Sequence, residues 1–283
     1  MSKTILLVHG AWVTPRSWAN FKQLFEAKGY TVVVPPWPFM DKPVGELQRH
    51  PNPGLAGQTI KGLVDYFEAQ IRALPTPPIL MGHSFGGLIV QMLLDRGLGT
   101  AGVAIDAAPP RGVFPSVAAV RSALPILSAW RGWRRILSMS FKSFSKTFAN
   151  TLPSKEQQTI YEQQIVPAPG RIYFQAALGI GNVVHFKNPK RPPLLLVGAE
   201  EDRTVTASMV RAMHRRHSRA PSSTDMMIFP SRSHWLIAEP GWEEVAEKAL
   251  DWAEHHANER QVQVTALRGM QLVETPKLKA REI

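Results

Sequence analysis

A serine flanked by glycines stands where a short apolar strand is expected to pass into an apolar helix. Residues 78–81 are predicted as the strand, the segment GHSFGG covers residues 82–87, and residues 88–94 are almost entirely apolar. A serine on so sharp a turn presents its hydroxyl as a nucleophile, and glycines two positions before and after it let strand and helix approach closely. Ser84 is therefore the candidate nucleophile, and it requires a base and an acid elsewhere in the chain.

The base should lie on a loop after the last strand, predicted at residues 225–229. Of the nine histidines, His234 in the segment SRSHW (residues 231–235) fits this position. His9 and His83 are interpreted as packed, hydrogen-bonded structural histidines. We therefore expect His234 to be the general base.

The acid that orients the imidazole should follow the predicted strand at residues 194–197, where the sequence reads GAEEDRTV (residues 198–205). Three successive carboxylates leave the choice open. Asp202 is favoured, because the pattern Asp-x-x-Val suits a loop that turns back towards its helix and the short side chain suits an imidazole. Glu201 is the alternative.

A tetrahedral intermediate needs hydrogen-bond donors aimed at its oxyanion, each contributing about 3 kcal/mol. The backbone N–H of Phe85 begins the predicted helix and is one donor. The second is expected in the segment HGAW (residues 9–12), with Ala11 N–H as the candidate. Trp12, His185 and Trp235 are candidates for contact with substrate.

The elements that position these residues alternate between strands and helices, as in a parallel sheet covered on both faces. Strands are predicted at residues 4–8, 31–34, 78–81, 102–106, 194–197 and 225–229. Helices are predicted near residues 17–27, 59–73, 84–94, 207–216 and 242–257.

The alternation stops after residue 108 for a stretch too long to be an ordinary loop. Within it, aromatic and aliphatic residues recur at steps of three and four, which predicts one amphipathic helix; they are Trp130, Trp133, Leu137, Phe141, Phe144 and Phe148. We expect a core of residues 1–109 and 192–257, a helical cap of residues 110–191, and a tail of residues 258–283.

Charge is concentrated in the cap. The chain has 33 Lys and Arg against 22 Asp and Glu. Residues 111–191 contain 12 of the basic residues, and their only acidic residues are two Glu. A basic amphipathic helix can lie on an anionic membrane surface. We favour the interpretation that the aromatic stripe packs over the pocket and the basic face is solvated, where it could steer anionic substrates; the basic residues are Arg131, Arg134, Arg135, Lys142 and Lys146.

Other features exclude whole classes of function. The chain has no cysteine, which rules out disulfides, thiolate nucleophiles and cysteine metal sites. No motif supports nucleic-acid binding. The apolar run near the N-terminus is too short for a signal-peptide core or a membrane span, so a cytoplasmic protein is expected.

In the order HGAW, GHSFGG, the acid loop and S-H-W, the chain resembles the α/β-hydrolase superfamily, in particular a compact esterase-like branch. The resemblance covers residue 5 to about residue 256 and is weak in the cap. It implies an α/β-hydrolase fold of about six mainly parallel strands with an inserted helical cap, no cofactor and no metal. It also implies a triad of Ser84, Asp202 and His234, with Ala11 and Phe85 as the oxyanion pair.

The expected activity is hydrolysis of a carboxylic ester or lactone through an acyl-enzyme on Ser84. Two alternatives stay open. The same triad supports C–C hydrolysis, cyanohydrin cleavage or perhydrolysis on this scaffold. The chain could also be a non-catalytic small-molecule receptor. A small-molecule ester or lactone is the expected partner in the first case, and the oligomeric state is left open.

Overall fold

The computed structural model describes residues 3–273, with side chains up to residue 258. At its centre lies a parallel sheet in the order β2-β1-β3-β4-β7-β8. The six predicted strands are confirmed, with bounds that differ by one or two residues; they are β1 (Thr4–Val8), β2 (Thr31–Val33), β3 (Ile79–His83), β4 (Gly102–Ile105), β7 (Leu194–Ala199) and β8 (Thr224–Phe229).

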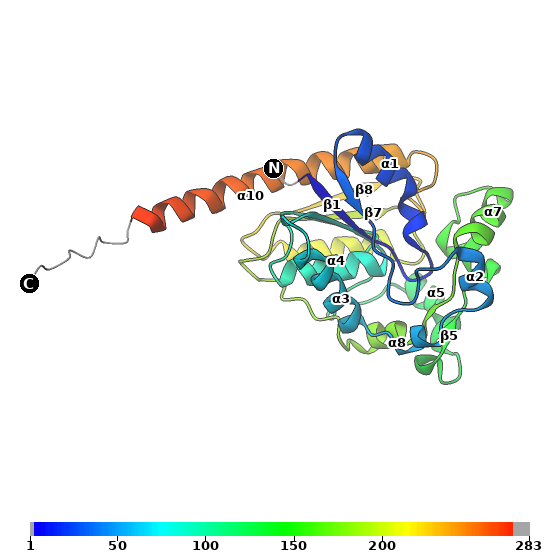
Figure 1. The fold of residues 1–283 in the computed structure, drawn as a ribbon. Helices are drawn as coiled ribbons and strands as arrows, with labels where there is room; N and C mark the ends of the chain where they lie inside the picture. The colour runs from blue at the N-terminus through cyan, green and yellow to red at the C-terminus, as the bar shows by residue number, and fades with distance from the viewer. Residues whose placement is uncertain (1–2, 274–283) are drawn as a thin grey trace, which may run out of the picture.

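Helices cover both faces of this sheet (Figure 1). Alternate residues of β1 point to opposite faces, and both sets are buried in different clusters: Leu6 and Val8 in one, Ile5 and Leu7 in the other. Helices α3, α4 and α9 contribute to the first cluster, and α1 and α10 to the second. The helices of the sheet domain are η1 (Pro15–Trp18), α1 (Ala19–Ala27), α3 (Ile60–Arg72), α4 (Phe85–Asp95), α9 (Ala207–His217) and α10 (Trp242–Val273).

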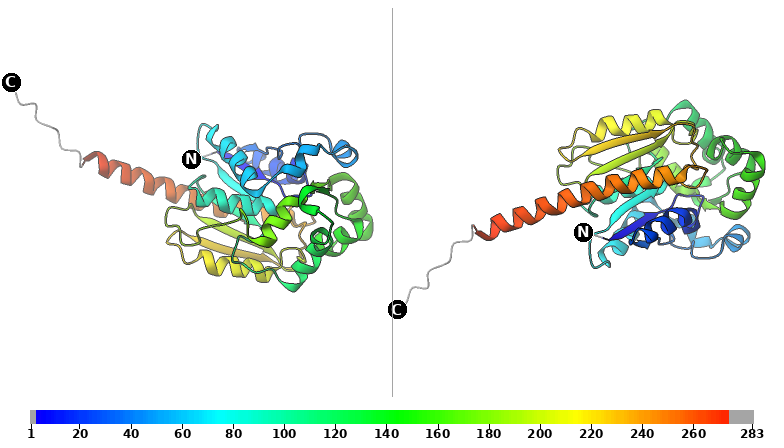
Figure 2. Two further views of the ribbon diagram at one scale, coloured as in Figure 1. Left: turned by 90° about the horizontal axis from the view of Figure 1, so that it is seen from below. Right: turned by 90° about the horizontal axis from the view of Figure 1, so that it is seen from above.

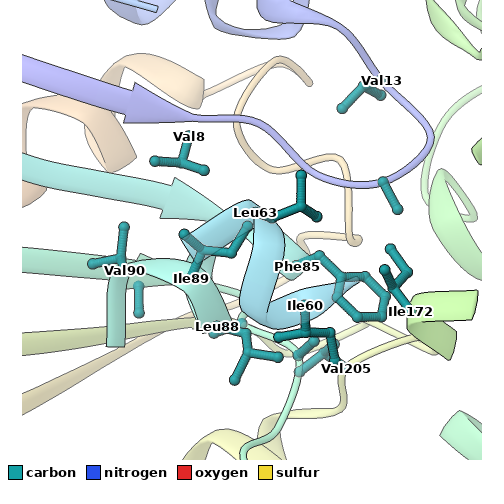
Figure 3. Packing of buried hydrophobic residues seen from close by; sticks show 14 of the residues in the cluster. Val8, Val13, Ile60, Leu63, Phe85, Leu88, Ile89, Val90, Ile172 and Val205 are labelled. Atoms are coloured by element: carbon teal, nitrogen blue, oxygen red, sulfur yellow. The ribbon is translucent and has the colours of Figure 1, made fainter. Parts of the chain in front are cut away.

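Helix α4 is almost completely shielded from solvent, because all its residues from Phe85 to Leu94 are buried. Figure 3 shows Leu88, Ile89 and Val90 of α4 among side chains from β1 and α3, with Ile172 beside Phe85. Ile172 belongs to the inserted segment, so the buried cluster continues from the sheet domain into the cap.

The inserted segment is built differently from the prediction of one helix through residues 130–148. Arg131 adopts a left-handed conformation (φ 52°), and residues 136–137 pair with residues 168–169 as a two-stranded ladder, so no continuous helix can form. The apolar spacing is shared among short elements instead. The cap elements are α5 (Val117–Leu127), η3 (Gly132–Arg134), β5 (Ile136–Leu137), α6 (Phe141–Ser143), the π-helix η4 (Phe144–Phe148), α7 (Ser154–Gln164), β6 (Ala168–Pro169) and α8 (Gly170–Leu178).

Part of the segment assigned to the core lies against the cap. The structure forms α2 (Val44–Arg49) and η2 (Pro53–Gly57) in a stretch for which the sequence predicted no helix. Gln48 of α2 donates hydrogen bonds to the carbonyl oxygens of Glu162 and Ile165 at the end of α7. Figure 1 shows α2, α5, α7 and α8 gathered at one end of the molecule, away from the far end of α10.

The predicted tail is partly helical. Helix α10 continues to Val273, well past the predicted end at residue 257, and Figure 2 shows it reaching beyond the sheet domain. Residues 258–268 contain no Gly or Pro, so helix propensity continues even though the amphipathic period fades. Residues 274–283 of the predicted tail lie outside the described residues. Within the described part of the chain, none of the helices combines the length and apolarity needed to cross a membrane.

Candidate active site

Ser84 forms the turn between β3 and α4 with an unusual backbone. Its φ of 57° and ψ of −122° lie in a region that residues with a side chain rarely adopt. The turn is held on both sides, because Ser84 N donates to Ile105 O (2.9 Å) and Ser84 O accepts from Ala108 N (3.0 Å). Such local strain is typical of functional positions that the surrounding structure fixes.

The glycines around Ser84 are required by close backbone approach. A Cβ on Gly82 would lie 2.2 Å from Gly86 O, and a Cβ on Gly86 would lie 2.1 Å from Val8 O. Real Cβ atoms do not approach backbone oxygens this closely, so only glycine fits either position. The neighbouring strands and the helix therefore pack at the distance that places Ser84 at the carboxyl edge of the sheet.

His234 and Asp202 meet beside this edge. Nδ1 of His234 lies 2.6 Å from Oδ2 of Asp202, and both side chains are fully buried. The other oxygen of Asp202 accepts hydrogen bonds from Thr204 N (2.6 Å) and Val205 N (2.9 Å). The Asp-x-x-Val pattern thus fixes the carboxylate against its own loop. Glu201, the sequence alternative, has an exposed side chain and no recorded contact with His234.

The second nitrogen of His234 points away from this pair. Nε2 is buried and has no hydrogen-bond partner among the described residues. The ring of Phe148, from the π-helix η4, packs edge-on against His234 with centroids 4.6 Å apart. Nε2 is therefore the ring nitrogen of His234 without a hydrogen bond among the described residues, and a cap residue covers the ring.

Two groups that the sequence analysis did not assign to the site hold the loop of His234. Glu239 accepts hydrogen bonds from Ser233 N (2.7 Å), Ser233 Oγ (2.9 Å) and Thr151 Oγ1 of the cap (2.6 Å). His83 Nε2 donates to His234 O at 2.8 Å. Burial lowers the pKa of His83 well below 6.5, so its ring is neutral. The only sequence signal for Glu239 is its place five residues after the predicted base.

Asp106, at the carboxyl end of β4, is a further buried acid that the sequence analysis left unassigned. Its Oδ1 accepts from Ala199 N at 2.9 Å, and its Oδ2 has no partner among the described residues. Burial, followed by the nearby charge of Asp202, raises the pKa of Asp106 well above 3.8. Burial and this charge therefore favour the protonated, neutral form of Asp106. An acidic residue ending an otherwise apolar strand is the signal that could have identified it.

Of the two proposed oxyanion donors, one begins helix α4 and the other lies on the loop after β1. Phe85 N–H is the first of α4 and cannot reach a carbonyl within its helix. Ala11 follows His9, whose Nε2 accepts from Trp37 N (3.1 Å) while Nδ1 donates to Gly10 O (2.8 Å). Burial lowers the pKa of His9 to about 4, so this neutral ring holds the loop of Ala11 in place.

A cavity of about 640 Å³ opens between the sheet domain and the cap. Ser84, Phe85 and Trp12 line it. Two of the three residues predicted to contact substrate lie elsewhere: His185 has an exposed side chain bound to Asp95, and Trp235 is buried against Phe148 outside the lining. The largest share of the lining comes from α5 and the segment before it, where the sequence analysis named no individual site residue.

One group of described residues has side-chain atoms near enough to share a metal ion: His83, Asp106 and His234, within 4.8 Å of one another. His234 is already bonded to Asp202, and the raised pKa of Asp106 makes its carboxyl a poor ligand. We therefore interpret the group as part of the acid and base cluster.

Comparison with known proteins places this geometry in a family. The model of the alpha/beta hydrolase family matches residues 5–248. No curated protein sequence matches the chain significantly.

Many solved structures share the fold. The monoacylglycerol lipase of Paleococcus ferrophilus is 18% identical, with 89% of this chain and 94% of that chain covered and a TM-score of 0.64. A pyrethroid hydrolase from Sphingobium faniae JZ-2 is 18% identical (90% and 98% covered, TM-score 0.61). Tomato methylketone synthase I complexed with 2-tridecanone is 14% identical (90% and 99% covered, TM-score 0.65). At these identities the likeness concerns the fold.

Proposed function

Since the chain belongs to the α/β-hydrolase family, we propose that it hydrolyses a carboxylic ester or lactone through an acyl-enzyme on Ser84. The observation that carries the proposal is the conjunction of a strained Ser84 lining a cavity with a buried pair of His234 and Asp202, 2.6 Å apart. These are the nucleophile, base and orienting acid that acyl transfer requires. Several proteins that share this fold are named as a lipase, an esterase or a hydrolase, which supports the proposal.

In the first step, Ser84 Oγ attacks the carbonyl carbon while its proton passes to His234 Nε2. Asp202 accepts the hydrogen bond of His234 Nδ1–H and keeps the ring oriented. The oxyanion is stabilised by the backbone N–H groups of Ala11 and Phe85, at about 3 kcal/mol each. His234 then gives its proton to the departing alkoxide, which leaves the acyl group on Ser84.

In the second step, His234 removes a proton from water, whose oxygen attacks the acyl-enzyme. Collapse of the second intermediate returns the proton to Ser84 and releases the acid. A lactone follows the same course, with the alcohol and the acid remaining in one product.

The cavity favours substrates with a large, neutral apolar group. Its lining is mainly aliphatic and aromatic, and Arg111 is its one charged residue. The cap residues considered for steering an anionic substrate are absent from the lining; they are Arg131, Arg134, Arg135, Lys142 and Lys146. We therefore expect activity to rise with the apolar length of the acyl or alcohol group until the cavity is filled.

The test is a panel of p-nitrophenyl esters of increasing chain length and of lactones, run with the wild-type protein and Ser84→Ala. Loss of turnover in Ser84→Ala with unchanged folding by circular dichroism is expected. Covalent labelling of Ser84 by a fluorophosphonate should disappear in the same variant. Full esterase turnover by Ser84→Ala would refute the mechanism, and labelling without turnover of any substrate would favour the receptor alternative. Turnover of cyanohydrins or C–C substrates alone would assign other chemistry to the same triad.

A further inference from the structure

Exposed apolar side chains are concentrated in one part of the molecule. Among the described residues, every exposed large apolar side chain except Phe39 lies between residues 114 and 183. Four are more than two thirds exposed: Phe114 (83%), Trp130 (81%), Val117 (76%) and Leu178 (71%). Clustered exposure of this kind marks an interaction surface, because isolated domains seldom leave so many large apolar groups in water.

Helix α5 is apolar on both of its sides. Val117, Val120 and Leu124 follow one another at steps of three and four and are all exposed. The opposite side of the helix, including Ala119 and Ile126, is buried and lines the cavity. A helix on the surface of a soluble domain normally turns a polar face to water. The only charged residue in α5 is Arg121, so its outer face lacks a partner within the described chain.

Some of the exposed apolar residues lie at the cavity itself. Phe114, Val120 and Leu178 are both exposed and part of the cavity lining. We call this surface the apolar rim, defined as Phe114, Val117, Val120, Leu124 and Leu178. Whatever covers the apolar rim therefore lies directly over the entrance that leads to Ser84.

Charge identifies the kind of partner. Residues 107–155 contain no Asp or Glu. Five arginines in this stretch are exposed and form no ion pair among the described residues; they are Arg111, Arg121, Arg131, Arg134 and Arg135. A surface that is both apolar and strongly basic is complementary to an anionic one with an apolar interior. A second copy of the same face would bring like charges together.

We propose that the apolar rim docks on the surface of an anionic lipid bilayer. Val117, Val120 and Leu124 enter the headgroup region, the arginines contact the lipid phosphates, and Trp130 lies at the level where indole rings are favoured. The cavity mouth then faces the bilayer, so an apolar substrate dissolved in lipid reaches Ser84 without crossing water. Docking is independent of the chemistry at Ser84, whereas delivery of an ester from the bilayer rests on the proposed function. The apolar rim itself lies outside residues 130–148, where the expected single helix does not form.

Docking is measured by sedimentation of the full-length Ser84→Ala protein with vesicles, so that turnover plays no part. We expect binding to vesicles of phosphatidylglycerol and phosphatidylcholine in equal parts, little binding to phosphatidylcholine alone, and weakening at high salt. The double variant Val117→Ser/Leu124→Ser, at positions outside the cavity lining, should bind at least about tenfold more weakly.

Arg121→Glu should weaken binding about fivefold or more. Its matched control is Lys28→Glu, which makes the same charge change at the end of α1, outside the cap and just before the edge strand β2. Lys28→Glu should bind as the parent does. In the background with Ser84 restored, all these variants should hydrolyse a short soluble p-nitrophenyl ester at the parental rate.

Absence of binding to anionic vesicles would overturn the proposal, as would equal weakening by Arg121→Glu and Lys28→Glu, which would indicate attraction by net charge alone. A concentration-dependent dimer that Val117→Ser/Leu124→Ser abolishes, without vesicle binding, would assign the apolar rim to a second copy instead. Failure of the proposed function would appear separately, as turnover by Ser84→Ala.

Discussion

At the scale of single residues, the site is a group of buried acids and histidines, and their surroundings determine which of them hold a proton. Asp202 accepts hydrogen bonds from two backbone N–H groups and from His234, whereas Asp106 accepts one from a backbone N–H and has a raised pKa. Two carboxyl groups in one buried cluster thus have different roles, because burial and the neighbouring charge disfavour a second negative charge.

This difference predicts which acid supports turnover. Asp202→Asn should lower kcat by about 10³-fold to 10⁴-fold with little change in KM. The amide oxygen of Asn would stay with Thr204 N and Val205 N, so its NH2 group would face Nδ1 of His234 and favour the tautomer protonated on Nε2, which cannot accept a proton from Ser84. Esterase kinetics on a short p-nitrophenyl ester measure the effect. Glu201→Gln, one position earlier in the same loop, is the matched control and should keep kcat within about twofold.

Asp106→Asn is the companion variant. Because its surroundings favour the protonated form of Asp106 and Asn keeps an oxygen to accept from Ala199 N, most of the activity should remain. A loss as large as that of Asp202→Asn would show instead that Asp106 acts as the orienting acid.

At the scale of elements, the nucleophile depends on how closely β1, β3 and α4 pack. Gly82 and Gly86 leave no space for a side chain, and Gly86 faces the carbonyl oxygen of Val8 at the end of β1. The same end of β1 leads into the loop of Ala11. Close packing of these elements therefore fixes both Ser84 and one oxyanion donor.

Gly86→Ala should consequently damage stability and activity together. Its Cβ would lie 2.1 Å from Val8 O and 2.7 Å from His9 O, which forces β1 and α4 apart. The free energy of unfolding should fall by about 3 kcal/mol, the upper part of the range for overpacked cores. Urea unfolding measures this change. Gly57→Ala, where a Cβ meets nothing within 4 Å, is the control and should change the free energy of unfolding by less than about 1 kcal/mol; an equal loss in both variants would contradict the argument.

At the scale of the whole molecule, buried neutral histidines make folding sensitive to acid. Burial lowers the pKa of His9 to about 4, that of His217 to about 3 and that of His83 well below 6.5. Between pH 6.5 and 4 the unfolded chain takes up protons at these positions and the folded chain does not. Their contribution to stability is therefore present above pH 6.5 and is lost as the pH falls. Asp106 acts in the opposite sense, because its raised pKa lets the folded chain hold a proton that the unfolded chain loses above pH 3.8.

The expected net effect is a fall in the free energy of unfolding between pH 6.5 and 4, since three histidines outweigh one aspartate. Each group contributes up to about 1.4 kcal/mol per pH unit. Urea unfolding as a function of pH measures the slope. His217→Gln should reduce the slope, because Gln does not titrate and can still donate to Gln91 Oε1, the present partner of His217 at 3.0 Å. Exposed His50→Gln is the control variant, and a slope that His217→Gln leaves unchanged would count against the explanation.

Much of the fold and part of the candidate site could be predicted from the sequence because the relevant signals are local. Short apolar runs specify the strands of the parallel sheet, and GHSFGG between a strand and an apolar helix specifies the turn of Ser84. His234 and the acid loop could be predicted because each follows a particular strand in the sequence, and parallel strands bring their carboxyl ends to one edge of the sheet. The family match is consistent with these local signals.

Tertiary structure decided what depends on contacts between distant segments. The aromatic spacing through residues 130–148 suited a helix, but pairing of β5 with β6 divided the segment into short elements. The contacts of Glu239 with Thr151 and the proximity of Asp106 to Asp202 join residues far apart in the chain. The position of α5 at the cavity also depends on contacts between distant segments, and it leaves apolar side chains on both sides of this helix. Periodicity reports that a face is apolar, whereas only the packed chain determines whether that face is covered by protein or left for a partner.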